Sequence, residues 1–146
     1  MTTAQTTPHP HAELVRRLFD AFGQQNREEI VAAIAEDCVW RVPGNNVIAG
    51  EYEGRAAVLS LFGRLKRLFT GPAGFEIIDL AVSQDRVMSY QYGTVVVGGE
   101  TVRLKECLVF RIDQGQVVEV DEFQYDQHTF DRVFSAEALA AATGAK

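Results

Sequence analysis

Two glutamates interrupt the apolar faces of the last two strands that the sequence predicts. Glu106 alternates with Leu104 and Leu108 in residues 101–112, and Glu122 alternates with Val120 in residues 117–125, because strand side chains alternate with a period of two. A buried charge without a partner costs several kcal/mol, so carboxyl groups on a core-facing side are expected to line a pocket. Two neighbouring carboxyl groups share a proton and can serve as general acid and base.

The turn between these strands sets the predicted pairing of the two carboxylates. The sequence Asp113-Gln114-Gly115 predicts a three-residue hairpin loop, with Gly115 in the left-handed conformation. That loop places Glu106 directly opposite Glu122 on one concave, apolar face. We therefore predict a raised pKa for Glu106, from burial and from the neighbouring carboxylate. The alternatives are a purely structural acid at Glu106 and a solvent-exposed Glu122 near its strand end.

Further candidates for a pocket wall come from three strands. Trp40 and Val42 share one face of a strand predicted over residues 37–43, and Tyr90 and Tyr92 place two hydroxyl groups on one face of the strand over 87–97. The predicted substrate-binding residues are Trp40, Val42, Tyr90, Tyr92, Leu108, Val120 and Gln124. Core packing of Trp40 and plain sheet packing of the two tyrosines are the alternatives.

The order of predicted elements indicates the fold class. Helical spacing of apolar residues marks a helix from Pro10 to Gly23, a short helix capped by Asn26, and a third helix that ends before Gly71. Strands are predicted over residues 37–43, 75–82, 87–97, 101–112 and 117–125, and a weak helical pattern follows over 126–142. We expect a tail over residues 1–11 and one α+β domain over 12–146, with helices on one face of a curved antiparallel sheet.

Composition and charge restrict the class of partner. The chain has 146 residues, 47% of them hydrophobic, and a net charge of −6, which gives no electrostatic support to nucleic-acid binding. No apolar run is long enough for a membrane span, and the polar N-terminus predicts a cytoplasmic protein. Cys38 and Cys107 fall on opposite strand phases, which predicts two free thiols. No metal-ligand spacing or glycine-rich phosphate loop is present in the sequence, so no cofactor is expected.

Two segments, Val39–Gly54 and Glu106–Phe123, resemble the SnoaL-like proteins of the ketosteroid isomerase and nuclear-transport-factor-2-like superfamily. The resemblance covers about residues 12–134. It implies a cone-shaped α+β fold with a largely apolar pocket. It also implies a homodimer through the convex sheet face, where Val109, Val117 and Phe123 are expected. Because this fold hosts isomerases, cyclases, epoxide hydrolases, dehydratases and non-catalytic binders, the activity depends on the site.

The resemblance carries over to individual positions only in part. Ketosteroid isomerases have a catalytic Asp where this chain has Val42 and an oxyanion-hole Tyr where it has Leu18, whereas their protonated pocket acid matches Glu106. In SnoaL-type cyclases the acid/base Asp falls on Glu122 and the neighbouring His on Val120. Limonene epoxide hydrolases need an Asp-Arg-Asp trio, and no inward Arg is expected here.

The sequence thus favours a cofactor-independent acid/base enzyme that acts on a small hydrophobic or polyketide-like molecule, with Glu106 and Glu122 as its catalytic residues. Isomerisation, cyclisation, dehydration and epoxide opening are all compatible with that pair. The alternative is a non-catalytic protein that binds a small molecule on the same fold.

Overall fold

The structure is a computed structural model that describes residues 9–144. Its elements are α1 (Pro10–Gly23), α2 (Arg27–Ala33), β1 (Ile34–Val42), β2 (Gly50–Glu53), α3 (Arg55–Leu68), β3 (Gly74–Val82), β4 (Arg86–Val97), β5 (Glu100–Asp113), β6 (Gln116–Gln124), α4 (Gln127–Val133) and α5 (Ala136–Gly144). Of the tail predicted over residues 1–11, residues 1–8 lie outside the described part of the chain. Pro10 and His11 already belong to α1, which His9 caps by accepting a hydrogen bond from the His11 backbone N–H.

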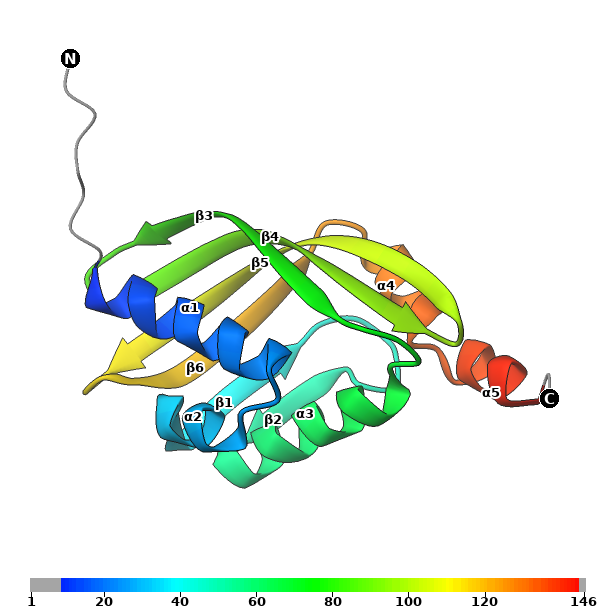
Figure 1. Cartoon of the computed structure of the whole chain (residues 1–146), viewed down its shortest axis with the longest axis horizontal. Coiled ribbons are helices and arrows are strands. Elements are labelled where there is room, and N and C mark those ends of the chain that lie inside the picture. The colour runs from blue at the N-terminus through cyan, green and yellow to red at the C-terminus, as the bar shows by residue number, and fades with distance from the viewer. Residues whose placement is uncertain (1–8, 145–146) are drawn as a thin grey trace, which may run out of the picture.

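The six strands form one curved sheet in the order β2-β1-β6-β5-β4-β3. Helices α1, α2 and α3 lie on one side of this sheet, and α4 and α5 lie at one end of it (Figure 1). This arrangement confirms the predicted α+β fold. The pairing is antiparallel except between β1 and β6, which run parallel. The short strand β2 lies in a segment for which the sequence predicted no strand.

The predicted register of the β5–β6 hairpin is wrong by two residues. Glu106 lies opposite Gln124, and Glu122 lies opposite Leu108. A shift of two residues preserves the alternation of faces. Glu106 and Glu122 therefore still project from the same face of the sheet, as diagonal neighbours and not as a directly opposed pair.

A tighter turn and a bulge account for this register. Gln114 and Gly115 both have positive φ angles, 50° and 76°, as in a two-residue type I′ turn; the positive φ of Gly115 was predicted. The pairing then shifts between Arg111 and Ile112, where Val118 is the extra residue on β6. The bulge also turns Val117 inward, so that this side chain is fully buried and the prediction that it lies on the convex face is wrong.

The two cysteines differ in their surroundings, as their strand phases predicted. Cys38 is buried beside Trp40 and Val42 in the core, and Cys107 on β5 is partly exposed. Both are free thiols, which confirms that prediction.

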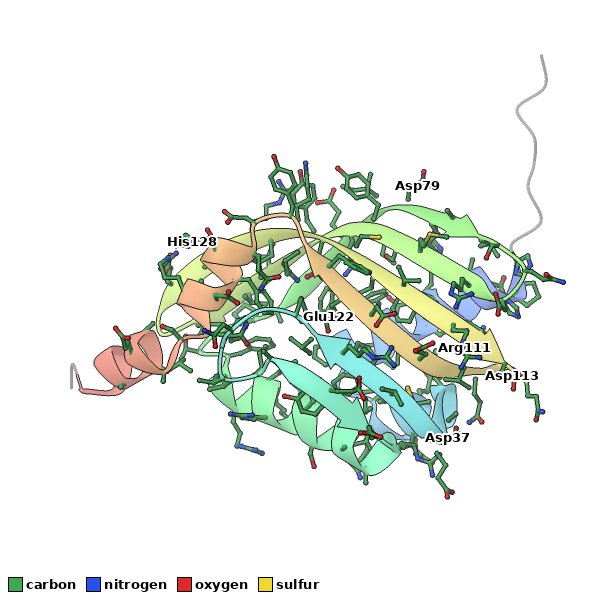
Figure 2. All side chains as sticks on the ribbon, turned by 180° about the vertical axis from the view of Figure 1, so that it is seen from behind. Asp37, Asp79, Arg111, Asp113, Glu122 and His128 are labelled. Carbon is green, nitrogen blue, oxygen red and sulfur yellow. The ribbon has the colours of Figure 1, made fainter. Side chains whose placement is uncertain are left out.

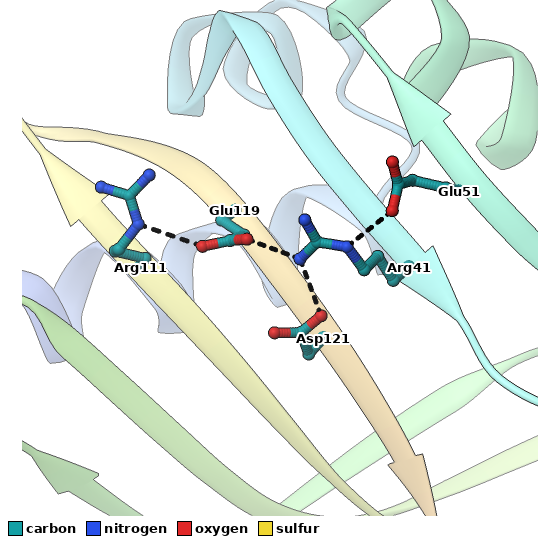
Figure 3. Close-up of polar contacts among 5 residues, drawn as sticks. All are labelled: Arg41, Glu51, Arg111, Glu119 and Asp121. Atoms are coloured by element: carbon teal, nitrogen blue, oxygen red, sulfur yellow. Dashed lines mark hydrogen bonds and ion pairs between the residues drawn. The ribbon is translucent and has the colours of Figure 1, made fainter.

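On the convex face, an ion-pair network crosses the junction between β1 and β6 (Figure 3). Arg41 donates to Glu51 at 2.9 Å, to Glu119 at 2.5 Å and to Asp121 at 3.0 Å, while Arg111 donates to Glu119 at 3.1 Å. The hydrogen bonds from Arg41 and Arg111 lower the pKa of Glu119. Because these side chains are partly exposed, each pair contributes at most about 1 kcal/mol. The network nevertheless fixes the relative positions of the strands β2, β1, β6 and β5.

Helix α4 closes one end of the cone and is held by the loop that follows β1. Asp131 Oδ1 accepts hydrogen bonds from the Asn45 backbone N–H at 3.1 Å, from Asn46 Nδ2 at 2.7 Å and from Gln127 Nε2 at 2.9 Å. The Val47 backbone N–H donates to the Phe134 carbonyl at 3.0 Å. The Asn45-Asn46 pair therefore anchors α4 to the loop that follows β1.

We expect Gly44→Ala to destabilise this closure by roughly 2–3 kcal/mol, as the sum of backbone strain and lost hydrogen bonds. Gly44 has φ +94°, and an added Cβ would overlap Asp131 Oδ1 and Gln127 Nε2, two atoms of the anchoring network. Urea denaturation measures the change. The control is Gly99→Ala, where φ is +79° but no atom lies within 4 Å of the new Cβ. An equal loss of unfolding free energy in the two variants would show that backbone strain alone acts and that the hydrogen bonds to Asp131 contribute nothing.

Candidate functional site

An apolar cavity lies between the concave face of the sheet and the helices α1, α3 and α4. Its volume is about 90 Å³. Among its described lining residues, Glu106 and Glu122 are the ionisable ones. The other lining residues are almost all aliphatic or aromatic and include Leu18, Phe19, Phe22, Trp40, Val42, Ile48, Phe62, Leu65, Phe69, Phe75, Phe110, Phe130 and Phe134.

Glu106 on β5 is held from both sides by side-chain amides. It is only 9% exposed. Gln91 Nε2 donates to its Oε2 at 2.7 Å, and Gln124 Nε2 donates to its Oε1 at 2.8 Å. Ser89 Oγ in turn donates to Gln91 Oε1 at 2.5 Å, and both of these residues are fully buried. This chain of hydrogen bonds positions the Glu106 carboxylate within an otherwise apolar core.

The two amide donors favour the charged form of Glu106. Each carboxylate oxygen accepts an N–H, and hydrogen bonds to a charged form stabilise that form. Burial raises the pKa of Glu106, as predicted, and the hydrogen bonds from Gln124 and Gln91 oppose that rise. The neighbouring carboxylate, which the sequence analysis named as a second cause for Glu106, acts instead on Glu122.

Glu122 on β6 has one hydrogen-bond partner in the described part of the chain. Its Oε2 accepts from Trp40 Nε1 at 2.5 Å. The residue as a whole is partly exposed, but its carboxyl group faces the cavity, and the burial of that group governs its ionisation. Burial and then the nearby charge of Glu106 raise the pKa of Glu122 to about 8, while the Trp40 hydrogen bond acts in the opposite direction. At neutral pH Glu122 is therefore protonated.

An aromatic wall orients the tryptophan that binds Glu122. The Trp40 ring meets Phe62 edge-on with a centroid separation of 5.0 Å, and Phe110 at 6.2 Å. Phe22 in turn packs edge-on against Phe62 at 5.2 Å and against Phe75 at 5.6 Å. These contacts fix the indole plane, and with it the direction from which Glu122 receives its hydrogen bond.

Several residues predicted for the pocket wall do lie at the cavity. Trp40, Val42 and Leu108 line it. Val120 is fully buried in the core, opposite Trp40 on one side and Phe110 on the other, and is not among the cavity-lining residues. Gln124 acts through its hydrogen bond to Glu106. The other side-chain atom of this amide, Oε1, is a buried acceptor without a hydrogen-bond partner among the described residues, but Gln124 is not among the cavity-lining residues.

The prediction that Tyr90 and Tyr92 line the pocket is wrong. The pairing of Gln91 with Glu106 directs the even-numbered residues of β4 to the convex face, where Tyr90 is 43% exposed. There the Arg103 guanidinium lies 3.6 Å from the centroid of the Tyr92 ring. His128 on α4 is exposed (Figure 2).

The inward face of β4 contributes site residues that were not predicted from the sequence. This face carries Ser89, Gln91 and Gly93 in alternation. The sequence pattern that could have indicated it is the run of polar and small residues between the inward Val87 and Val95. Gly93 has a specific function at the cavity. A Cβ added to it would lie 3.3 Å from Glu106 Oε2, so the glycine keeps space open beside the carboxylate.

The model of the SnoaL-like domain matches residues 15–120, and the chain belongs to this family. This result confirms the resemblance inferred from Val39–Gly54 and Glu106–Phe123. Within the described residues 9–144, no helix is long and apolar enough to cross a membrane, and no three His, Cys, Asp or Glu side chains are grouped to hold a metal ion.

Solved structures share the fold over most of this chain. Bal32a, from a soil-derived mobile gene cassette, is 29% identical with a TM-score of 0.82, over 86% of this chain and 96% of that one. A nuclear-transport-factor-2-like protein of Burkholderia pseudomallei is 20% identical with a TM-score of 0.79, over 88% and 100% of the two chains. An epoxide hydrolase of the limonene-epoxide-hydrolase-like type from Mycobacterium tuberculosis is 20% identical with a TM-score of 0.64, over 93% of each chain. The fold is therefore that of the nuclear-transport-factor-2-like proteins.

Proposed function

We propose that this protein is a cofactor-independent acid/base enzyme for a small hydrophobic or polyketide-like molecule. The observation that supports this most directly is the unequal hydrogen bonding of the two cavity carboxyl groups. Glu106 accepts two amide N–H groups and Glu122 accepts one indole N–H. Two carboxyl groups whose surroundings separate their pKa values are the typical arrangement for paired acid and base work.

In this proposal Glu106 is the base and Glu122 is the acid. Glu106 removes a proton from a carbon next to a carbonyl group, or from a hydroxyl group of the substrate. Glu122 gives its proton to the oxygen on which negative charge develops. After one transfer of each kind the proton has moved from Glu122 to Glu106, and the reverse transfers, or exchange with water, restore the starting state. The apolar walls exclude water and so strengthen both interactions.

A second function, binding without catalysis, has its own support. Val42 stands where ketosteroid isomerases have their catalytic Asp, and Val120 stands where SnoaL-type cyclases have a His. In a binding protein, the cavity-lining Glu122 would serve only to hold a polar group of the ligand.

Deuterium exchange separates the two functions and requires only a ligand with an acidic C–H group. Alkyl-substituted cyclohexenones and aryl ketones are first tested for binding through the fluorescence of Trp40, the only tryptophan of the chain. Compounds that bind are then incubated in D₂O, and loss of the proton signal next to the carbonyl group is followed by NMR. An enzyme accelerates exchange above the buffer rate, and Glu106→Gln removes that acceleration. If compounds bind but neither exchange nor convert, the binding function replaces the catalytic one.

We also propose a homodimer through the convex face of the sheet. Phe123 on β6 is 56% exposed, and Tyr125 just beyond it is 79% exposed. Tyr90 and Met88 on β4 extend the same apolar patch. Exposed apolar patches of this kind commonly mark interfaces. Sedimentation of the wild-type protein and of Phe123→Asp tests the proposal, because a dimer through this face would dissociate in the variant.

A further inference from the structure

A second, larger hollow adjoins the inner cavity on the outside of the molecule. We call it the outer groove. It lies between the end of α1, the helices α2 and α3, and residues 71–73, and its volume is about 570 Å³. Phe22, Phe62 and Phe69 line both the outer groove and the inner cavity. The aromatic wall beside Trp40 is therefore the partition between the two spaces.

The sizes of the two spaces set a limit on how a ligand can sit. Sites for small molecules usually measure about 300–1,000 Å³, whereas the inner cavity measures about 90 Å³. The inner cavity holds the reacting end of a molecule and little more. A larger ligand with one end at Glu106 has to extend beyond the inner cavity, and the outer groove is the adjoining space that shares the rings of Phe22 and Phe62.

The charges of the outer groove indicate what the remainder of the ligand carries. Among the described residues that line the groove, Arg27 and Lys66 are the ionisable ones, and both are cations. Neither takes part in any ion pair or side-chain hydrogen bond of the described part of the chain. The exposed acids Glu28 and Glu29 on α2 do not line the groove. Two unpaired cations thus sit beside apolar surface in a protein whose net charge is −6.

We infer that the outer groove binds the anionic end of an amphipathic ligand whose uncharged, reacting end occupies the inner cavity. The ligand class is an organic carboxylate, or another molecule with an anionic group at the end of an apolar chain. Arg27 and Lys66 hold the anion, and the rings of Phe22 and Phe62 contact the chain between the two ends. This inference rests on the proposed function, because it takes the inner cavity as the place where the ligand reacts.

Two probes with the same carbon chain and a charged or an uncharged head group test the inference. Decanoate and decanol are titrated into the protein at pH 7, below their aggregation limits, and binding is read from Trp40 fluorescence. The variants are Arg27→Gln, Lys66→Gln and the double substitution. Arg64→Gln is the matched control, because Arg64 is an exposed cation of α3 that does not line the groove.

The double substitution should weaken decanoate binding about five- to tenfold, from two partly screened charge interactions. Decanol binding should stay within about twofold of the wild type, since the apolar contacts are unchanged. In 0.5 M salt the preference of the wild-type protein for decanoate over decanol should decrease toward the preference shown by the double variant. The control should behave like the wild type.

Three results would overturn the inference: unchanged decanoate binding in the double variant, an equal loss in Arg64→Gln, or no fluorescence response to either probe. These outcomes are distinct from a failure of the proposed function, which the deuterium-exchange experiment decides. If the double variant keeps wild-type affinity for decanoate while exchange depends on Glu106, only the outer-groove assignment is lost.

Discussion

Glu122→Gln is expected to lower the rate of deuterium exchange about 10²- to 10⁴-fold, which is the usual contribution of a general acid. The amide keeps an oxygen that can accept the hydrogen bond from Trp40 Nε1, so the shape of the cavity is retained while the transferable proton is lost. The effect should appear in kcat and leave KM nearly unchanged, because proton donation stabilises the transition state more than the bound substrate. Initial rates are measured on the compound that exchanges fastest with the wild-type protein.

A control variant on the same strand separates catalysis from a general change in the protein. Glu119 also lies on β6, but its carboxylate is on the convex face and pairs with Arg41 and Arg111. Glu119→Gln should exchange at the wild-type rate. A Glu122→Gln variant that loses affinity for the compound instead of turnover would assign Glu122 to binding.

The second large effect concerns stability. The folded wild-type protein is expected to lose roughly 4 kcal/mol of unfolding free energy between pH 5 and pH 9. The pKa of Glu122 is raised from its ordinary value of 4.5 to about 8 in the folded state. Between these two values the folded protein binds a proton that the unfolded chain has released. The contribution of Glu122 to the free energy of unfolding is therefore fully present below pH 4.5 and is lost as the pH rises through about 8.

Urea denaturation at pH 5, 7 and 9 measures this slope, and Glu122→Gln should reduce it to the part contributed by Glu106, whose pKa burial also raises. Other groups with shifted pKa values act mainly outside this range. Carboxylates with lowered pKa, such as Glu119 and Asp126, contribute at lower pH, and the Cys38 thiol, whose pKa burial raises to about 12, contributes above pH 9. A wild-type protein that gains stability toward pH 9 would indicate that Glu122 is charged and ion-paired in the fold.

The sequence was sufficient to place Glu106 and Glu122 on one face of the sheet, because the alternation of strand side chains depends only on local geometry. It was insufficient for their pairing. The register depends on the positive φ of Gln114 and on the extra residue Val118. Both features involve a single residue with no distinctive side chain, so the three-residue loop was an equally good interpretation of the same letters.

The wrong assignment of Tyr90 and Tyr92 has a different physical cause. Alternation divides β4 into two faces but does not say which one is buried. The aromatic face looked like a pocket wall, and the face with Ser89, Gln91 and Gly93 looked like a solvated one. Burial of the polar residues is favourable only because Glu106 on the next strand accepts the hydrogen bond from Gln91, a contact between residues 15 positions apart.

The position of β6 between β1 and β5 affects the order in which the sheet folds during synthesis. Strand β6 lies between β1 and β5 in the sheet, so a chain still under synthesis has two separate pieces, β2-β1 and β5-β4-β3, each with an unpaired edge. Trp40 and Glu122 are 82 positions apart, and such distant contacts form late and slowly. We expect insertion of β6 to be the last step of folding. A ribosome-bound or truncated chain that lacks β6 then lacks Glu122 and the hydrogen bond from Gln124 to Glu106, so that the carboxyl pair of the cavity is assembled only when the whole sheet is complete.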